Sequence, residues 1–319
     1  MWPIVVSEVS GLKSLKNGEE IPGLVVAFPM TAKQMMEHRE LALKKIIKSA
    51  KFSKKLGASI IGLGGLTTSL SKGGLDIIDK VKINITTGHA YTAYTVTSNV
   101  IKLVKEIGMD KNFIVVAIVG ATGSIGSTSA KILAKEGFAN LLLIDIERKK
   151  HFFKNLIEEV SSINQKINIE TTPKIQEIKK ADIIITATNA PEAVVRNDYL
   201  KSGAIIVDDA QPSDVHPEVF EREDVMAIEA GVVHTPNIDS HFNFGLKDKY
   251  DNFCCMCEIM ILAANNWDEH YVINRANLKN VDHIVNLSKG LGFRLAKYQN
   301  FKEVISSDKI NRIKKVINK

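Results

Sequence analysis

Cysteine and long apolar runs are scarce in this chain, and each scarcity excludes a class of protein. The 319 residues include three cysteines, all within 254–257, so there is no framework of spaced disulfides. No apolar run approaches the roughly 18 residues that a membrane-spanning helix needs. The N-terminus has no basic segment followed by a long apolar stretch. We therefore expect a cytoplasmic protein without a membrane span.

Basic residues exceed acidic ones, which gives a formal net charge of +6. The lysines are spread along predicted helices and gather near the C-terminus, a pattern typical of solvated helix faces. A basic surface favours acidic partners, such as a carrier protein or the phosphates of coenzyme A. No recognition motif for nucleic acid accompanies the charge, so we expect no nucleic-acid partner. The sequence leaves homo-oligomerisation open.

The spacing of apolar residues changes along the chain. Residues 33–56 and 88–107 have apolar positions at helical spacing, with a glycine-ended strand at 59–65 between them. Beyond these, continuous apolar runs typical of buried parallel strands alternate with helical patterns. The predicted strands are 113–119, 140–144, 181–186 and 204–207, and the predicted helices are 124–137 and 147–163.

This alternation predicts an α/β fold with a Rossmann-type doubly wound parallel sheet. We assign the dinucleotide-binding domain to residues 108–238 and an N-terminal substrate domain to residues 1–107. The C-terminal segment, residues 239–319, is predicted to be helical and to pack with the N-terminal domain. Together these two segments form a second α/β domain.

A glycine-rich turn follows the first buried strand and opens a helix. This placement gives the G-x-x-G-x-x-G spacing its meaning, because the free N–H groups at a helix N-terminus bind a pyrophosphate and glycines allow its close approach. An ordinary glycine-rich turn is the alternative. The predicted cofactor-binding residues of the turn are Gly120, Ala121, Thr122, Gly123, Ser124, Ile125 and Gly126.

Two further segments bear on the cofactor. Asp145 ends the second strand, where a carboxylate accepts hydrogen bonds from the adenosine ribose and repels a 2′-phosphate, which favours NADH. Arg148 lies three residues later and is suited to the 2′-phosphate of NADPH, so NAD(P)H stays open with NADH preferred. Thr188 and Asn189, in a small-residue segment after a strand, are predicted to lie near the nicotinamide half.

The three cysteines begin an apolar helical run. If Asn252 caps this helix, Cys255 lies in its first turn, where the helix dipole favours the nucleophilic thiolate. A nucleophilic thiol beside a nicotinamide site indicates acyl transfer to sulfur followed by hydride reduction to an aldehyde. For Cys254 and Cys257 core packing is the simpler interpretation. Their C-x-x-C spacing also suits a redox pair or half a zinc site, but no second pair exists and we predict no metal.

The chain resembles the long-chain acyl-(acyl carrier protein) reductases, which form fatty aldehydes, on a shikimate-dehydrogenase-like two-domain plan. The resemblance runs from about residue 28 to 296 and rests on ordered segments. These segments are Leu63-Gly64-Gly65-Leu66-Thr67, Thr86-Thr87-Gly88-His89, the glycine turn, Gly231-Val232-Val233, and 253–262 followed by Arg275. The resemblance implies that Cys255 is the acylated cysteine and that NADPH is the cofactor.

The chain also departs from that family. His89 and Tyr91 stand where the family has asparagine and histidine, and Asp145-Ile146-Glu147 stands where it has an arginine. Acyl length or substrate class can therefore differ. Histidine is the usual proton donor near neutral pH, and His89 and His234 are the catalytic candidates, with a structural role as the alternative for each.

The leading hypothesis is an NAD(P)H-dependent reductase that converts an acyl thioester, on acyl carrier protein or coenzyme A, to an aldehyde through an acyl-cysteine. The alternative is an NAD(P)-dependent dehydrogenase of a small hydroxy or amino acid, with packed cysteines. Such an enzyme is expected to carry a Lys–Asp pair in its N-terminal domain, and the sequence does not identify one. A third hypothesis is a non-catalytic nucleotide or redox sensor.

Overall fold

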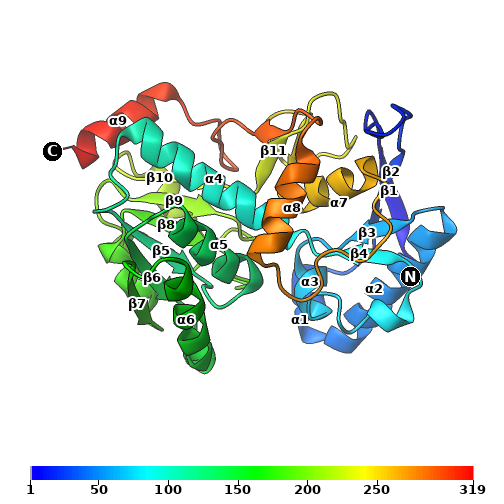
Figure 1. The fold of residues 1–319 in the computed structure, drawn as a ribbon, viewed down its shortest axis with the longest axis horizontal. Coiled ribbons are helices and arrows are strands. Elements are labelled where there is room, and N and C mark those ends of the chain that lie inside the picture. The colour runs from blue at the N-terminus through cyan, green and yellow to red at the C-terminus, as the bar shows by residue number, and fades with distance from the viewer. Residues whose placement is uncertain (1, 319) are drawn as a thin grey trace. The chain divides into compact units, whose positions relative to one another are not determined.

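The computed structural model describes residues 2–318 and divides into two compact units (Figure 1). The first unit combines Met1–Thr92 with Val232–Ala296, and the second combines Ala93–Gly231 with Lys297–Lys319. Helix α4 (His89–Ile107) begins in the first unit and continues into the second. None of the described helices is both long and apolar enough to cross a membrane.

The second unit is built on a six-stranded parallel sheet, which confirms the predicted Rossmann-type α/β fold. The strand order is β10-β9-β8-β5-β6-β7. Its strands are β5 (Val115–Val119), β6 (Asn140–Ile144), β7 (Asn168–Thr172), β8 (Ile183–Thr186), β9 (Ile205–Asp208) and β10 (Met226–Glu229). Most central-strand residues are buried on both faces, so their sequences read as continuous apolar runs. The edge strand β7 is more exposed and polar, and for that reason the sequence pattern missed it.

Different elements cover the two faces of this sheet. Helices α4, α5 (Ser124–Lys135), α6 (Phe153–Ile163) and α9 (Ser307–Ile317) bury their apolar sides in the core on one face. The other face is covered mainly by 3-10 helices at 175–180 and 217–221 and by loops. The predicted helix at 147–163 starts as a 3-10 helix, and α6 proper begins at Phe153.

The C-terminal tail groups with this sheet. Its helix α9 packs against β10, and Ile313 is fully buried in the same core as Val207 and Met226. The sequence had suggested that all of 239–319 packs with the N-terminal segment. Residues 297–319 instead lie in the second unit, because the isoleucines of α9 form one apolar face that fits the sheet core.

The first unit is assembled from short strands that are distant in sequence. An antiparallel pair joins β1 (Ile4–Val9) to β2 (Gly23–Ala27), and a parallel pair joins β3 (Ile60–Gly62) to β4 (Asn84–Thr86). A three-stranded antiparallel sheet has the order β12-β11-β13. Its strands are β11 (Val232–His234), β12 (Asp251–Phe253) and β13 (Arg294–Leu295).

Among the described residues, five further helices complete the first unit. They are α1 (Ala32–Glu37), α2 (Arg39–Lys55), α3 (Leu66–Leu70), α7 (Cys254–Ala264) and α8 (Leu278–Ser288). The single helix predicted for 33–56 is therefore two helices, because the backbone at His38 leaves the helical region. Ile85 of β4 is fully buried and belongs to the same core of this unit as Ile46 of α2.

Candidate functional site

The glycine turn lies between β5 and α5, where the sequence places it. Gly120 has a φ of +82°, and a Cβ atom there would lie 2.5 Å from the carbonyl oxygen of Ala187. A Cβ atom on Gly126 would lie 2.4 Å from the carbonyl oxygen of Gly120. Both positions therefore require glycine, one for the backbone angle and the other for the close packing of the helix start.

The N-terminus of α5 is open to a ligand. Its N-cap residue is Gly123, which offers no side-chain oxygen to the N–H groups of the first helical turn. A Cβ atom on Gly123 would meet only the carbonyl oxygen of Gly120, at 3.1 Å. The remaining predicted residues are Ala121 and Thr122 in the turn and Ser124, Ile125 and Gly126 in the first turn of α5. The arrangement suits a phosphate group.

The turn lies at the point where the order of the strands along the sheet reverses. The chain proceeds from β5 to β6 and β7 on one side and then crosses to β8 on the other, and Val119 pairs with Thr186 at the ends of β5 and β8. In open α/β sheets, ligands bind beyond the carboxyl ends of the strands at such a switch point. Thr188 follows β8 there, and Asn189 is exposed beside it.

Asp145 is held inside the protein. Its side chain is 4% exposed, and its Oδ2 accepts hydrogen bonds from the backbone N–H (3.0 Å) and the hydroxyl (2.5 Å) of Thr122. Its Oδ1 accepts from the N–H of Ile146 and lies 3.5 Å from Lys149 Nζ. Asp145 thus fixes the glycine turn, and its predicted role toward a ribose remains a prediction. Arg148 is exposed.

Two buried carboxylates hold the loops after β8 and β9. Asp214 accepts a hydrogen bond from the hydroxyl of Thr188 at 2.6 Å, and burial raises the pKa of Asp214 to about 7. Asp208 accepts from the hydroxyls of Thr186 and Ser213, and burial raises its pKa as well. The sequence prediction did not include these carboxylates. Asp208, the last residue of the apolar strand β9, was an available signal, whereas Asp214 lies six residues later in a loop.

The three cysteines differ in exposure and environment. Helix α7 begins at Cys254 with Phe253 as its N-cap, so the predicted cap residues Asp251 and Asn252 belong to β12 instead. Cys254 is buried, with its Sγ 3.0 Å from the hydroxyl of Thr92, and Cys257 is buried with its thiol pKa raised by burial.

Cys255 is partly exposed and lies in the first turn of α7, as predicted. Gly88 contacts it so closely that a Cβ atom on Gly88 would lie 2.4 Å from Cys255 Cβ. Gly88 also has a φ of +79°, so both the backbone angle and the approach require glycine. We call Cys255 together with residues 86–91 the cysteine site.

Glu258 anchors the cysteine site and was not among the predicted residues. It is fully buried, and its carboxylate accepts hydrogen bonds from the hydroxyl of Thr86 and from the backbone N–H groups of Gly88 (3.1 Å) and Tyr91 (2.8 Å). Burial raises its pKa. A lone acidic residue inside an apolar helical run was the signal in the sequence, since carboxylates are rarely buried without a specific partner.

Two side chains next to Gly88 have unpaired polar atoms. Among the residues that the structure describes, Thr87 Oγ1 and His89 Nδ1 are buried atoms without a hydrogen-bond partner. Burial lowers the pKa of His89 to about 4, so its imidazole is neutral at pH 7. Buried polar atoms usually have hydrogen-bond partners, and the structure gives these two none.

His234 lies apart from these residues in sequence, on β11. Its Nδ1 is 3.0 Å from Asp251 Oδ1, and ligand atoms of His234, Asp248 and Asp251 lie within 4.8 Å of one another. A cavity of about 340 Å³ is lined by residues between 239 and 251, including Asp248 and Asp251. The three side chains can hold a cation, although the sequence predicted none. The closeness of these three side chains does not by itself establish a cation site.

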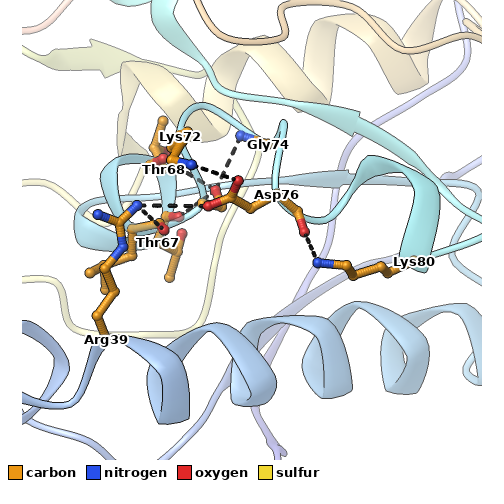
Figure 2. A network of polar contacts seen from close by, with 9 residues as sticks. Arg39, Thr67, Thr68, Lys72, Gly74, Asp76 and Lys80 are labelled. Atoms are coloured by element: carbon orange, nitrogen blue, oxygen red, sulfur yellow. Dashed lines mark hydrogen bonds and ion pairs between the residues drawn. The ribbon is translucent and has the colours of Figure 1, made fainter.

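A polar network follows β3, within the segment that begins Leu63-Gly64-Gly65 (Figure 2). Asp76 lies between Lys72 Nζ, at 3.2 Å, and Arg39 Nη2, at 3.7 Å, and its backbone oxygen accepts a hydrogen bond from Lys80. The Lys72–Asp76 pair is a Lys–Asp pair in the N-terminal segment that spacing alone had not identified. Lys33 pairs with Glu37 on the exposed side of α1.

Residues 102–230 match the family model described as Shikimate / quinate 5-dehydrogenase. The matched stretch contains all six strands of the parallel sheet and the glycine turn. The match supports the shikimate-dehydrogenase-like plan of the second unit. It does not extend to the cysteine site.

Two curated relatives match most of the chain, and a third matches a shorter part of it. Aminotransferase PigE of Serratia sp. is 23% identical over 307 residues, which are 94% of this chain and 35% of PigE. The chain thus spans about a third of PigE. Long-chain acyl-[acyl-carrier-protein] reductase of Synechococcus elongatus is 25% identical over 284 residues, 84% of this chain and 80% of the reductase. L-2-hydroxycarboxylate dehydrogenase (NAD(P)(+)) of Methanocaldococcus jannaschii is 32% identical over 101 residues, 29% of this chain and 32% of that enzyme.

Proposed function

We propose that the protein is an NAD(P)-dependent oxidoreductase. The observation that carries this proposal is the glycine turn, which opens an uncapped helix N-terminus at the switch point of a parallel sheet. The match of residues 102–230 to the shikimate / quinate 5-dehydrogenase family supports it. Residues 120–126 hold the pyrophosphate, and Thr188 and Asn189 border the nicotinamide half. When bound, the cofactor supplies or accepts the hydride.

For the cofactor we propose a preference for NADH. Asp145 adds a negative charge at the end of β6, which disfavours a 2′-phosphate nearby. Arg148, which is exposed three residues later, acts in the opposite direction. The ratio of kcat/KM for NADH to that for NADPH tests this preference, and a ratio below one would assign the dominant role to Arg148 or its neighbouring lysines.

For the reaction we propose reduction of an acyl thioester to an aldehyde through Cys255. Cys255 is the partly exposed thiol of the three and lies at a helix N-terminus, which favours the thiolate. The thiolate attacks the carbonyl carbon, the carrier thiol leaves with a proton, and an acyl-cysteine results. The neutral imidazole of His89 and the Asp251-paired His234 are the candidate proton carriers. Acyl carrier protein or coenzyme A is the proposed partner.

The second candidate is an NAD(P)-dependent dehydrogenase of a small hydroxy or amino acid. The family match and the hydroxycarboxylate dehydrogenase relative favour this candidate more than they favour thioester reduction. Within the first unit, the Lys72–Asp76 pair is the feature that suits it. In this candidate the cysteines have only packing roles.

Covalent labelling separates the two candidates. The protein is incubated with octanoyl-coenzyme A or octanoyl-acyl carrier protein without reduced cofactor, and its intact mass is measured. We expect one acyl adduct, which Cys255→Ser abolishes and the matched controls Cys254→Ser and Cys257→Ser retain. Full turnover of thioester by Cys255→Ser would exclude the acyl-cysteine. The absence of any adduct, together with loss of hydroxy-acid oxidation in Lys72→Ala, would establish the second candidate.

A further inference from the structure

Glu258 is a fully buried carboxylate without a cationic partner among the described residues. Its hydrogen bonds come from the hydroxyl of Thr86 and from the backbone N–H groups of Gly88, Ala90 and Tyr91. All of these donors belong to the 86–91 segment. Because a buried charge is costly unless it is well hydrogen-bonded, this concentration of donors on one side chain indicates a specific task.

These donors lie at the start of helix α4, which begins at His89. The first N–H groups of a helix have no partner within it and carry partial positive charge. Gly88 precedes the helix and has no side chain that can cap it. Glu258 therefore caps α4 from another helix, α7, and ties the start of α4 to α7 within the first unit.

The same helix, α7, carries the proposed nucleophile. Cys255 and Glu258 are three residues apart and so share one side of the helix. Gly88 lies directly against Cys255, and its N–H group donates to Glu258. One short stretch of backbone is thus fixed by Glu258 and packed on Cys255.

We propose that Glu258 is a positioning residue, which holds the 86–91 segment over Cys255 and so sets how a thioester reaches the thiol. The proposal rests on the proposed function only for the identity of the substrate. The unpaired Thr87 and His89 atoms flank Gly88, so the anchor also fixes these two polar groups beside the thiol. Loss of the hydrogen bonds between Glu258 and residues 86–91 leaves Cys255 on helix α7, but the 86–91 segment is then no longer held in place next to it.

The test compares two reactions of Cys255 in Glu258→Gln. The glutamine retains the shape of the side chain, but its NH₂ group faces donors and cannot accept from them. A misplacement of about 1 Å at a reacting group costs on the order of 10²-fold in rate, and we expect acylation by octanoyl-coenzyme A to slow by about tenfold to a hundredfold. Iodoacetamide is small and does not need residues 86–91 to be held in place. Its reaction with Cys255 should therefore become at least about threefold faster as the exposure of the thiol rises.

The opposite changes in these two rates distinguish positioning from general loss of stability. A loosened fold would also expose Cys254 and Cys257, which we expect to stay protected, as read by mass spectrometry of labelled peptides. Ile46→Ala is the matched control, because it weakens a core of the same unit that includes neither Cys255 nor Glu258. The control should leave both Cys255 rates within about twofold of the wild type.

Gly88→Ala supplies a second route to the same contact. Its Cβ atom would overlap Cys255, so the variant should also slow acylation. Because both variants disturb one contact, the double variant should be little slower than the worse single variant, whereas independent effects would multiply. Multiplying effects would overturn the proposal, and so would an unchanged acylation rate in folded Glu258→Gln.

Failure of the proposed function is recognised separately. If the wild type forms no adduct with any thioester, thioester reduction is excluded. The rate at which iodoacetamide labels Cys255 in Glu258→Gln then tests the positioning role of Glu258 by itself. Faster labelling of Cys255 with protected Cys254 and Cys257 would then uphold the anchor, and unchanged labelling would overturn it.

Discussion

The two units assemble their candidate sites in different ways. In the second unit, the glycine turn and its flanking strand and helix come from one stretch, residues 115–135. In the first unit, the contact between Thr86 and Glu258 joins residues 172 positions apart. A locally built site depends on backbone geometry at a few glycines, whereas the cysteine site depends on buried polar anchors between distant segments. Variants that affect one site and spare the other sharpen this contrast.

The largest effect is expected from Gly123→Val. The side chain would project into the space that the pyrophosphate needs, while the backbone angle of Gly123 is ordinary and its only close neighbour is one carbonyl oxygen. We expect cofactor affinity to fall by at least about 100-fold in isothermal titration, with the fold and Cys255 labelling intact. Gly64→Val, also in open space but in the first unit, is the control. Unchanged affinity in a folded Gly123→Val protein would locate the cofactor elsewhere.

Asp214→Asn tests the buried carboxylates of the second unit. Because the folded-state pKa of Asp214 is raised to about 7, folding favours its protonated form. Its contribution to stability is fully present below the unfolded pKa near 4 and is lost as pH rises toward 7. The variant should lack this loss, which we place on the order of 2 kcal/mol, as measured by urea unfolding at pH 4 and pH 7.5. Equal pH dependence in both proteins would contradict the shift.

His89→Gln tests the opposite dependence of stability on pH in the first unit. The folded-state pKa of His89 is lowered to about 4, so folding favours the neutral ring. Its contribution is fully present above the unfolded pKa of 6.5 and is lost as pH falls toward 4. We expect the wild type to lose about 1 to 2 kcal/mol more than the variant between pH 7 and pH 4.5. A ¹H NMR titration that gives His89 an ordinary pKa would refute this expectation.

Substitutions at helix caps should change the free energy of unfolding least. In the first unit, Asn277 and Asn280 form a reciprocal capping box at the start of α8, whereas in the second unit Ser306 caps α9 with a single hydrogen bond. The double variant Asn277→Ala/Asn280→Ala should cost about 1 kcal/mol and Ser306→Ala about half as much, because the first removes both reciprocal hydrogen bonds of the box and the second removes one. Thermal unfolding of both variants measures the order, and a larger loss for Ser306→Ala would reverse it.

The sheet of the second unit was predictable because its central strands are buried on both faces. The run from Val115 to Val119 contains only apolar residues, and the next strand, 140–144, is apolar after Asn140, so each is visible without knowledge of its neighbours. The glycine turn was also predictable, because its strand, turn and helix are contiguous in the sequence. The predicted strand start at Phe113 was two residues early, because that side chain is 82% exposed.

The first unit was harder to predict because its strands have only two to six residues and pair across long gaps. Cys255 was predicted as a site residue from its position at an expected helix start, and it lies in the first turn of α7. Its contact with Gly88 and the role of Glu258 were not predicted, since no periodicity connects residue 88 with residues 255 and 258. The position of α9 was missed because an amphipathic helix does not specify which core its apolar face joins.

The division of the first unit between Met1–Thr92 and Val232–Ala296 has a consequence for biosynthesis. Residues 1–92 are synthesised well before α7 and the three-stranded sheet of β11, β12 and β13 exist. Val9 and Leu12, whose core partners Ile238, Met260 and Ala264 come from the later segment, must therefore wait with apolar surface exposed while the whole parallel sheet is synthesised. Chaperone demand in the cell should accordingly concentrate on the nascent N-terminal segment rather than on the sheet that follows it.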